Sequence, residues 1–470
     1  NGDGNVGVVD LLVTIDQWGP CSNCDADVNG DGEVNVLDLL VIIDQWGECQ
    51  DAPLGACVLP SQTCTVVEES ECNSLGGLGW LAKGSCSDID GDRIPDDFEL
   101  NDCSFQSGAF SGSDPLVADT DEDGIEDGDE VFGTLAGLDL QAFGCNPCRK
   151  DILVETDWVY ANGASVDRNK LHGNQVYRIV EAFANAPVTN VDGTTGITMH
   201  IDYGQAPYNG GNSVADPNGN SSIDFDTWEF NGEFPIIKTN NFNSNRHGYF
   251  HYCVLADAYS VGGVQTGSSG LGELPGDDFV TTMGAWSIGD DDRIGNTFVH
   301  ELGHNLNIRH GGFENRNWKP NYNSVMNYRH QFCGVDTNGD SYSDFVLDYS
   351  RGTNIQLNEN SLNETVGVTG FGPAIDWDED GNANETSVSR NINCELETWY
   401  CGPWSMLTRT CGSGTDCYDS TCNVASDHND WANVYYHGID DDNLLSREII
   451  HCLFDRAKIV IKSSSSASEK

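Results

Sequence analysis

The stretch "HELGHNLNIRHGG", from His300 to Gly312, decides which fold we expect for this chain. His300 and His304 are four residues apart, so on a helix both imidazoles leave the same face, one turn apart. That spacing lets them bind one zinc ion, while Glu301 is placed to hold a water molecule at the metal rather than to bind the metal itself. Apolar and small residues at positions 294–306 predict a helix that is buried along one side.

The third histidine of this stretch requires a break in the helix. His310 comes six residues after His304, too far round to share its face if the helix continued. Asn307 stands between them, and asparagine adopts left-handed backbone angles more readily than most residues, so it ends a helix at modest cost. We therefore expect the helix to stop near Asn307 and His310 to turn back as a third zinc ligand.

This pattern resembles the zinc signature of the metzincin metallopeptidases, H-E-x-x-H-x-x-G-x-x-H, with Asn307 in place of the glycine. "NSVMNY" (323–328) is similar to the Met-turn of that family, and the resemblance extends over 149–350, with the secreted, pappalysin-like bacterial branch as the nearest. The resemblance implies that Met326 forms an apolar floor beneath the zinc, and that Tyr328 binds the metal or steadies the oxyanion. Without the histidines, Met326 would be interpreted as an ordinary core methionine.

The activity that this resemblance implies is hydrolysis of a protein or peptide substrate. Zinc would lower the pKa of a water molecule, and Glu301 would take its proton and pass it to the leaving amine. The alternative is a non-catalytic extracellular structural or adhesion protein, such as a filament subunit formed by self-assembly. In that case the metzincin-like domain and its calcium loops would serve only as building blocks.

A duplication opens the chain: residues 1–21 match residues 29–49 at an offset of 28. Alternating oxygen ligands, followed by an apolar helical run, are typical of EF-hand-like calcium loops, because such ligands all point inward around a hard cation. The pair resembles a dockerin-type module, which implies a cohesin-like or cell-surface partner; plain Asp/Gly turns are the alternative. The first loop starts at its third position, so we expect either a cut mature protein or a preceding segment. The expected calcium ligands are Asp27, Asn29, Asp31, Glu33, Asn35 and Asp38 in the second copy, and Asn1, Asp3, Asn5 and Asp10 in the truncated first copy.

Further acidic loops follow in two regions. "DIDGDRIPDDFE" (88–99) and "DTDEDGIEDGDE" (119–130) resemble thrombospondin type 3-like calcium repeats. Apart from this resemblance, carboxylates this dense repel one another unless cations lie between them, which also predicts bound calcium. For the loops within residues 50–148 the alternative is an ordinary acidic linker. Two later loops, at 336–344 and 376–380, are also predicted to bind calcium, and for these the alternative is plain polar turns. The expected ligands are Asp88, Asp90, Asp92, Asp96 and Glu99; Asp119, Asp121, Asp123, Asp127 and Glu130; then Asp336, Asn338, Asp340 and Asp344; and finally Asp376, Asp378 and Asp380.

Composition restricts the partners and the compartment. The chain of 470 residues has a formal net charge of -53, which argues against nucleic acid or an anionic membrane surface as a partner and favours divalent cations. A solvated acidic surface, as in salt-adapted proteins, would give the same balance. Eighteen scattered cysteines predict structural disulfides, and therefore a secreted, extracellular or cell-surface protein. No membrane-length apolar run and no signal peptide are visible, so we expect a mature or trimmed chain.

These patterns together predict an α/β (α+β) metzincin-like domain with smaller modules on either side. Strands are expected at 150–158, 196–204 and 249–259, and a helix at 169–186. The predicted organisation is a helical dockerin-like module at 1–49, a cysteine-rich calcium-loop linker at 50–148, the zinc peptidase domain at 149–350, and a disulfide- and calcium-loop-containing subdomain at 351–470 with a Ser-rich tail.

Overall fold

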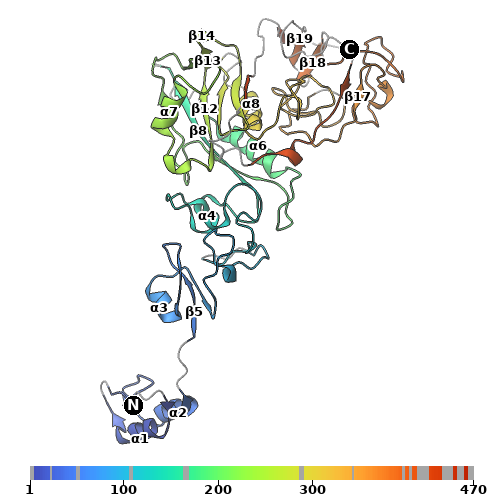
Figure 1. Cartoon of the computed structure of the whole chain (residues 1–470). Helices are drawn as coiled ribbons and strands as arrows, with labels where there is room; N and C mark the ends of the chain where they lie inside the picture. The colour runs from blue at the N-terminus through green and yellow to red at the C-terminus, as the bar shows by residue number, and fades with distance from the viewer. Residues whose placement is uncertain are drawn as a thin grey trace. The chain divides into compact units, whose positions relative to one another are not determined.

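The computed structural model shows a mixed α/β protein with several sheets and a few helices (Figure 1). It divides into two compact units, residues 1–87 and 88–470, which we describe separately. Among the residues that the structure describes, no helix is both long and apolar enough to cross a membrane. The structure describes residues 5–21, 24–48, 53–104, 109–161, 169–284, 291–340, 343–393, 397–401, 405–409, 423–436, 448–451 and 460–463.

The sequence duplication at the start of the first unit is also a structural duplication. Each copy has one nine-residue helix, and an aspartate closes the loop before each helix. Asp10 accepts a hydrogen bond from the backbone N–H of Gly7 at 2.9 Å, and Asp38 accepts one from Asn35 at 2.8 Å. The elements are β1 (Asn5–Val6), α1 (Val8–Asp16), β2 (Gly19–Pro20), β3 (Glu33–Val34), α2 (Val36–Asp44) and β4 (Gly47–Glu48), with β1 antiparallel to β4 and β2 to β3.

The rest of the first unit is a small antiparallel sheet held by two disulfides. Its order is β6-β5-β7, and the pairs Cys57–Cys72 and Cys64–Cys86 close it. The unit ends at Ser87, inside the segment 50–148 that we predicted to be one linker. The elements are β5 (Leu54–Val58), β6 (Cys64–Glu68), α3 (Glu69–Ser74) and β7 (Gly79–Ala82).

The two long acidic loops open the second unit, and they pack on each other. A Cβ added at Gly128 would lie 1.8 Å from the backbone oxygen of Asp92, so only glycine permits this approach. The Cys103–Cys148 disulfide closes the region. Its elements are η1 (Asp96–Phe98), α4 (Asp127–Phe132) and α5 (Leu140–Phe143).

A seven-stranded sheet forms the centre of the second unit. Its order is β10-β8-β12-β16-β15-β21, and β9 also pairs with β8. Strands β9, β10, β8, β12 and β16 run parallel, whereas β15 is antiparallel to both β16 and β21. The elements are β8 (Asp151–Tyr160), β9 (Thr198–Asp202), β10 (Ser213–Ala215), β12 (Phe250–Ala256), β15 (Gly270–Leu274), β16 (Asp278–Thr282) and β21 (Glu448–His451).

Both faces of this sheet are covered, which explains why nearly every residue of β8 and β12 is buried, including the polar ones. Helices α6 and α8 pack together on one face, where Ile179, Phe183 and Phe298 belong to one buried cluster. A second cluster, with Phe234 and Tyr259, lies on the other face. The elements that cover the two faces are α6 (Gly173–Ala184), β11 (Ser222–Phe225), α7 (Phe234–Asn241), η2 (Ser244–Arg246), β13 (Ala258–Val261), β14 (Val264–Gln265) and α8 (Asp291–Asn305).

The expected strands and helices of this domain are present, with one difference. The run 249–259, predicted as one strand, divides into β12 and β13, which join different sheets. The two strands adjoin at Asp257, whose backbone N–H instead bonds to the carbonyl of Ser221 at 3.0 Å.

The last part of the chain contains short strands around a small apolar cluster that includes Leu357, Trp377 and Ile392. The side chains of the five cysteines between 394 and 422 lie outside the described residues, so the predicted disulfide staple there stays a prediction. The elements are β17 (Leu357–Asn358), η3 (Glu364–Val366), β18 (Glu397–Cys401), β19 (Ser405–Arg409), β20 (Val424–Ala425), η5 (Trp431–Asn433) and β22 (Val460–Ser463).

Candidate metal centre

Helix α8 brings the first two histidines and the glutamate to the sheet. It packs on β15 and β16, and its inward face is apolar, with Phe298 and Leu302 fully buried. His300, Glu301 and His304 each have an exposed fraction of 0%. The helix therefore presents both imidazoles and the carboxylate inside the protein, one turn apart as the sequence predicts.

The end of α8 returns the chain toward these side chains. Asn307 has a φ of 68°, the left-handed conformation expected for it. The N–H of Ile308 bonds to the carbonyl of Gly303 at 2.8 Å, and that of Asn307 bonds to His304 at 2.9 Å. These two bonds are the 6→1 and 5→2 pair of a Schellman motif, which satisfies carbonyls at the helix end and reverses the chain.

His310 is thereby placed beside the two helical histidines. Its ring centroid lies 5.2 Å from that of His300 and 4.9 Å from that of His304, and the two helical rings are 4.9 Å apart. One nitrogen from each ring lies within 4.8 Å of the others, and His310 is only 5% exposed. Three buried imidazoles that face one another form a donor set suited to zinc.

Backbone carbonyls orient two of the rings. Nδ1 of His300 lies 2.8 Å from the carbonyl oxygen of Val325, and Nδ1 of His304 lies 2.8 Å from that of Ile308. Each Nδ1 must carry the proton to donate these bonds, so Nε2 keeps its lone pair for a metal. Burial lowers the pKa of His300 to about 4, and burial also lowers the pKa of His304 and His310, so all three rings are neutral at pH 7.

Two glycines of β15 give the α8 side chains their room. A Cβ at Gly270 would lie 2.2 Å from Oε1 of Glu301, and one at Gly272 would lie 3.1 Å from Cβ of His304. Strand β15 therefore runs directly alongside the histidine helix. Its other edge pairs with β21, where Gly272 is opposite Ile450.

Met326 and Tyr328 lie next to the histidines. A Cβ at Gly303, on α8 between the two helical histidines, would lie 2.3 Å from Sδ of Met326, so this sulfur packs directly on the helix. The Tyr328 ring centroid is 4.5 Å from that of His310 and 5.7 Å from that of His300. The residues named by the Met-turn pattern are thus adjacent to the cluster, although 15 residues lie between Gly312 and Tyr328 in the sequence.

The two packed acidic loops carry buried oxygens that accept no hydrogen bond within the described part of the chain. They are one oxygen each of Asp90, Asp92, Glu99 and Asp121, and both carboxylate oxygens of Glu130. Burial raises the pKa of Glu99 and of Asp121 to about 8. These are positions three, five and twelve of an EF-hand-like loop, the positions whose oxygens bind the ion.

Asp127 lies where the two acidic loops meet. Its carboxylate accepts hydrogen bonds from the backbone N–H and the hydroxyl of Thr120, in its own loop, at 2.9 and 2.6 Å. The same carboxylate, together with those of Asp92 and Glu99, forms a buried group whose oxygens lie within 4.8 Å of one another. The spacing places Asp127 in the second loop alone and does not reveal its contact with ligands of the first.

In the other predicted loops, backbone N–H groups bond to the side-chain oxygens of the expected ligands. In the 27–38 loop, the N–H of Asp31 bonds to Oδ1 of both Asp27 and Asn29, and in the 376–380 loop the N–H of Asp380 bonds to Asp376 and Asp378 in the same way. In the 336–344 loop the N–H of Asp340 bonds to Asn338 at 2.9 Å, and Asp344 accepts from Thr337.

Two further predicted ligands lie in the 27–38 loop, and those at the start of the chain are only partly described. Asn35 uses its side-chain oxygen to cap α2, accepting from Leu37 at 2.8 Å, and the Glu33 side chain is exposed. Asn1 and Asp3, and the side chain of Asn5, lie outside the described residues.

The sequence analysis missed one loop of this kind, at 216–224. The N–H of Asn220 bonds to carboxylate Oδ2 of Asp216 at 2.5 Å and to Asn218 at 3.1 Å, and Asp224 and Glu233 lie beside it. The D-x-N-x-N spacing was visible in the sequence, but two asparagines and Pro217 make it less acidic than the other loops.

Comparisons of this chain with protein-family models, with curated proteins and with solved structures found no match.

Proposed function

We propose that this protein is a secreted, calcium-stabilised zinc endopeptidase. The observation that carries the proposal is the convergence of His300, His304 and His310 with Glu301 adjacent on the same helix. The two carbonyl-bound rings offer Nε2, and three neutral imidazoles leave one position of a tetrahedral zinc for water or substrate. The similarity of residues 149–350 to the metzincin family supports the same conclusion.

In this mechanism the three histidines would hold zinc, which supplies a Lewis acid for the peptide carbonyl and lowers the pKa of a water molecule. Glu301 accepts the proton of that water and later donates it to the leaving amine. The ring of Tyr328 packs against His310, and we propose that its hydroxyl donates a hydrogen bond to the developing oxyanion.

Calcium is the second cofactor of the proposal. Six buried carboxylate oxygens of the two packed loops, on Asp90, Asp92, Glu99, Asp121 and Glu130, accept no hydrogen bonds within the described residues, so a hard divalent cation would satisfy them. The loops at 27–38, 336–344 and 376–380 belong to the proposal because of their ligand spacing and the backbone N–H groups that bond to their side-chain oxygens. The four described disulfides, including Cys21–Cys24, favour an oxidising, extracellular location. A cohesin-like or cell-surface partner for the duplicated N-terminal module is part of the proposal.

A second candidate function is a non-catalytic structural protein, and burial favours it. The three histidines and Glu301 are 95% buried or more, and β21 pairs with the outer edge of β15 beside them. An extended peptide would bind such an edge as an added strand, so a substrate must displace β21 or approach from another side. A zinc that stays enclosed would only stabilise the fold.

The Glu301→Gln variant separates the two candidates. The peptidase proposal expects zinc content equal to wild type but no cleavage of a casein-type substrate. Glu181→Gln, a matched change at an exposed glutamate on α6, should retain full cleavage. Wild-type protein with one histidine-bound zinc and no cleavage, or full cleavage by Glu301→Gln, would contradict the proposal and favour the structural role.

A further inference from the structure

A second group of metal-binding side chains lies outside the histidine cluster. Cys145, Asp151 and His200 are each 2–4% exposed, and their ligand atoms all lie within 4.8 Å of one another. Cys145 follows α5, Asp151 is the first residue of β8, and His200 lies on the paired strand β9. None of the sequence patterns pointed to these residues.

The geometry around His200 resembles that of a metal ligand. Its Nδ1 lies 2.9 Å from the hydroxyl of Tyr208, which fixes the ring and leaves Nε2 facing the other two groups. Nε2 lies 2.6 Å from Oδ1 of Asp151 and 4.0 Å from Sγ of Cys145. The backbone N–H of Asn146 donates to Oδ2 of Asp151 at 3.0 Å and so holds this carboxylate beside Cys145.

Cys145 is one of two free cysteines among the described residues, in a chain where its neighbour Cys148 is bonded to Cys103. A buried thiol left unpaired in a disulfide-rich protein calls for an explanation. Sγ of Cys145 lies 4.0 Å from Nε2 of His200, so the unpaired thiol faces the imidazole. A coordinated metal removes the proton of such a thiol.

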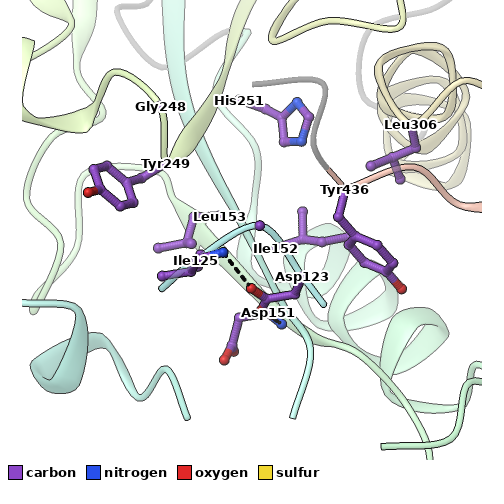
Figure 2. Close-up of a pocket in the computed structure, with 11 residues that line it drawn as sticks. Asp123, Ile125, Asp151, Ile152, Leu153, Gly248, Tyr249, His251, Leu306 and Tyr436 are labelled. Carbon is purple, nitrogen blue, oxygen red and sulfur yellow. Dashed lines mark hydrogen bonds between the residues drawn. The ribbon is translucent and has the colours of Figure 1, made fainter. Parts of the chain in front are cut away.

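The surroundings of the group are acidic. Asp121, Asp123 and Glu130 are buried nearby, and the N–H of Asp151 donates to Oδ2 of Asp123 at 2.6 Å. Figure 2 shows Asp123 and Asp151 next to each other in a pocket that His251 and Leu306 line on the opposite side. Lys150 brings a positive charge to this region, and its Nζ contacts the backbone oxygen of Asp121. This field attracts a divalent cation.

We propose that Cys145, Asp151 and His200 bind a second transition-metal ion of the zinc class. Thiolate, imidazole and carboxylate are the donors that zinc takes in proteins, whereas calcium avoids sulfur and nitrogen. One thiolate and one carboxylate neutralise the two positive charges of zinc, which is what a buried site requires. The ion would tie the end of the acidic-loop region to strands β8 and β9, and the proposal does not depend on peptidase activity.

Cobalt titration of the full chain tests this site, because only a sulfur ligand gives thiolate-to-cobalt charge-transfer absorption and the three-histidine cluster has none. The protein is stripped of metal without reductant, and excess calcium is returned to fill the acidic loops. We expect wild type to bind two equivalents of cobalt and to develop the absorption of one sulfur-bound ion. Cys145→Ser should lose it, whereas Cys253→Ser, a change at the other free buried cysteine, should keep it.

The zinc content of His300→Ala provides a second measurement that does not require Cys145→Ser to fold. We expect folded His300→Ala to retain one zinc per chain and, when loaded with cobalt instead, to keep the charge-transfer absorption. If only the three-histidine site fails to bind metal, wild type should bind a single cobalt through Cys145 and keep the absorption. That result would contradict the peptidase proposal and support the second site. Saturation of wild type without the absorption, or its persistence in Cys145→Ser, would overturn the proposal and leave an Asp151–His200 ion pair beside a core thiol.

Discussion

If the proposed peptidase mechanism holds, replacing Gly270 by alanine should reduce peptide cleavage without changing the zinc content. The new Cβ would lie 2.2 Å from Oε1 and 2.4 Å from Cδ of Glu301, whereas ordinary contact begins near 3.4 Å. The carboxylate must therefore move by about 1.2 Å, the difference between 3.4 and 2.2 Å. A misplacement of about 1 Å costs on the order of 100-fold in rate, or about 2.7 kcal/mol of transition-state stabilisation. No zinc ligand is touched, because the nearest atoms to that Cβ all belong to Glu301.

The matched control is Gly295→Ala on α8 itself. Its Cβ would meet nothing closer than 3.9 Å, so activity should stay at the wild-type level while stability rises by roughly 0.5–1 kcal/mol. The assay compares kcat/KM on a fluorogenic casein-derived peptide with zinc content measured by mass spectrometry. If Gly270→Ala matches Gly295→Ala in kcat/KM at equal zinc content, then the position of Glu301 does not govern the reaction and the reasoning is wrong.

Two further predictions concern the sheet below the site. Arg246, 4% exposed, contacts the fully buried Glu155 and Asp202 at 2.5 and 2.6 Å, so Arg246→Met should destabilise the protein by about 3–5 kcal/mol in urea unfolding. Arg149→Met, at an exposed pair with Asp192, should cost less than about 1 kcal/mol, and equal losses would contradict the burial argument. Burial raises the pKa of Asp157 from 3.8 to about 6, so wild-type stability should fall as pH rises from about 4 to 6. Asp157→Asn lacks this titration, and its stability relative to wild type should rise by up to about 3 kcal/mol between pH 4 and pH 7; a difference constant with pH would refute the assignment.

The sequence by itself determined the local features of this protein. Helix α8, its end at Asn307, the duplicated N-terminal loops and the closure of each by Asp10 or Asp38 follow from residues close together in the chain. Such features depend on helical periodicity, capping and turn chemistry, which act over a few residues. The run at 249–259 was recognised as extended, but its division between two sheets was not, because the partner strands lie elsewhere in the chain.

Only the tertiary structure decided which distant residues meet. Asp127 joins the ligands of the other acidic loop, Gly270 makes room for Glu301, and Cys145 meets His200 across 55 residues of sequence. Each of these contacts depends on which strands become neighbours in the sheet and how closely two backbones approach. No spacing in a single sequence encodes that choice, because it follows from burying the apolar faces of all the elements together.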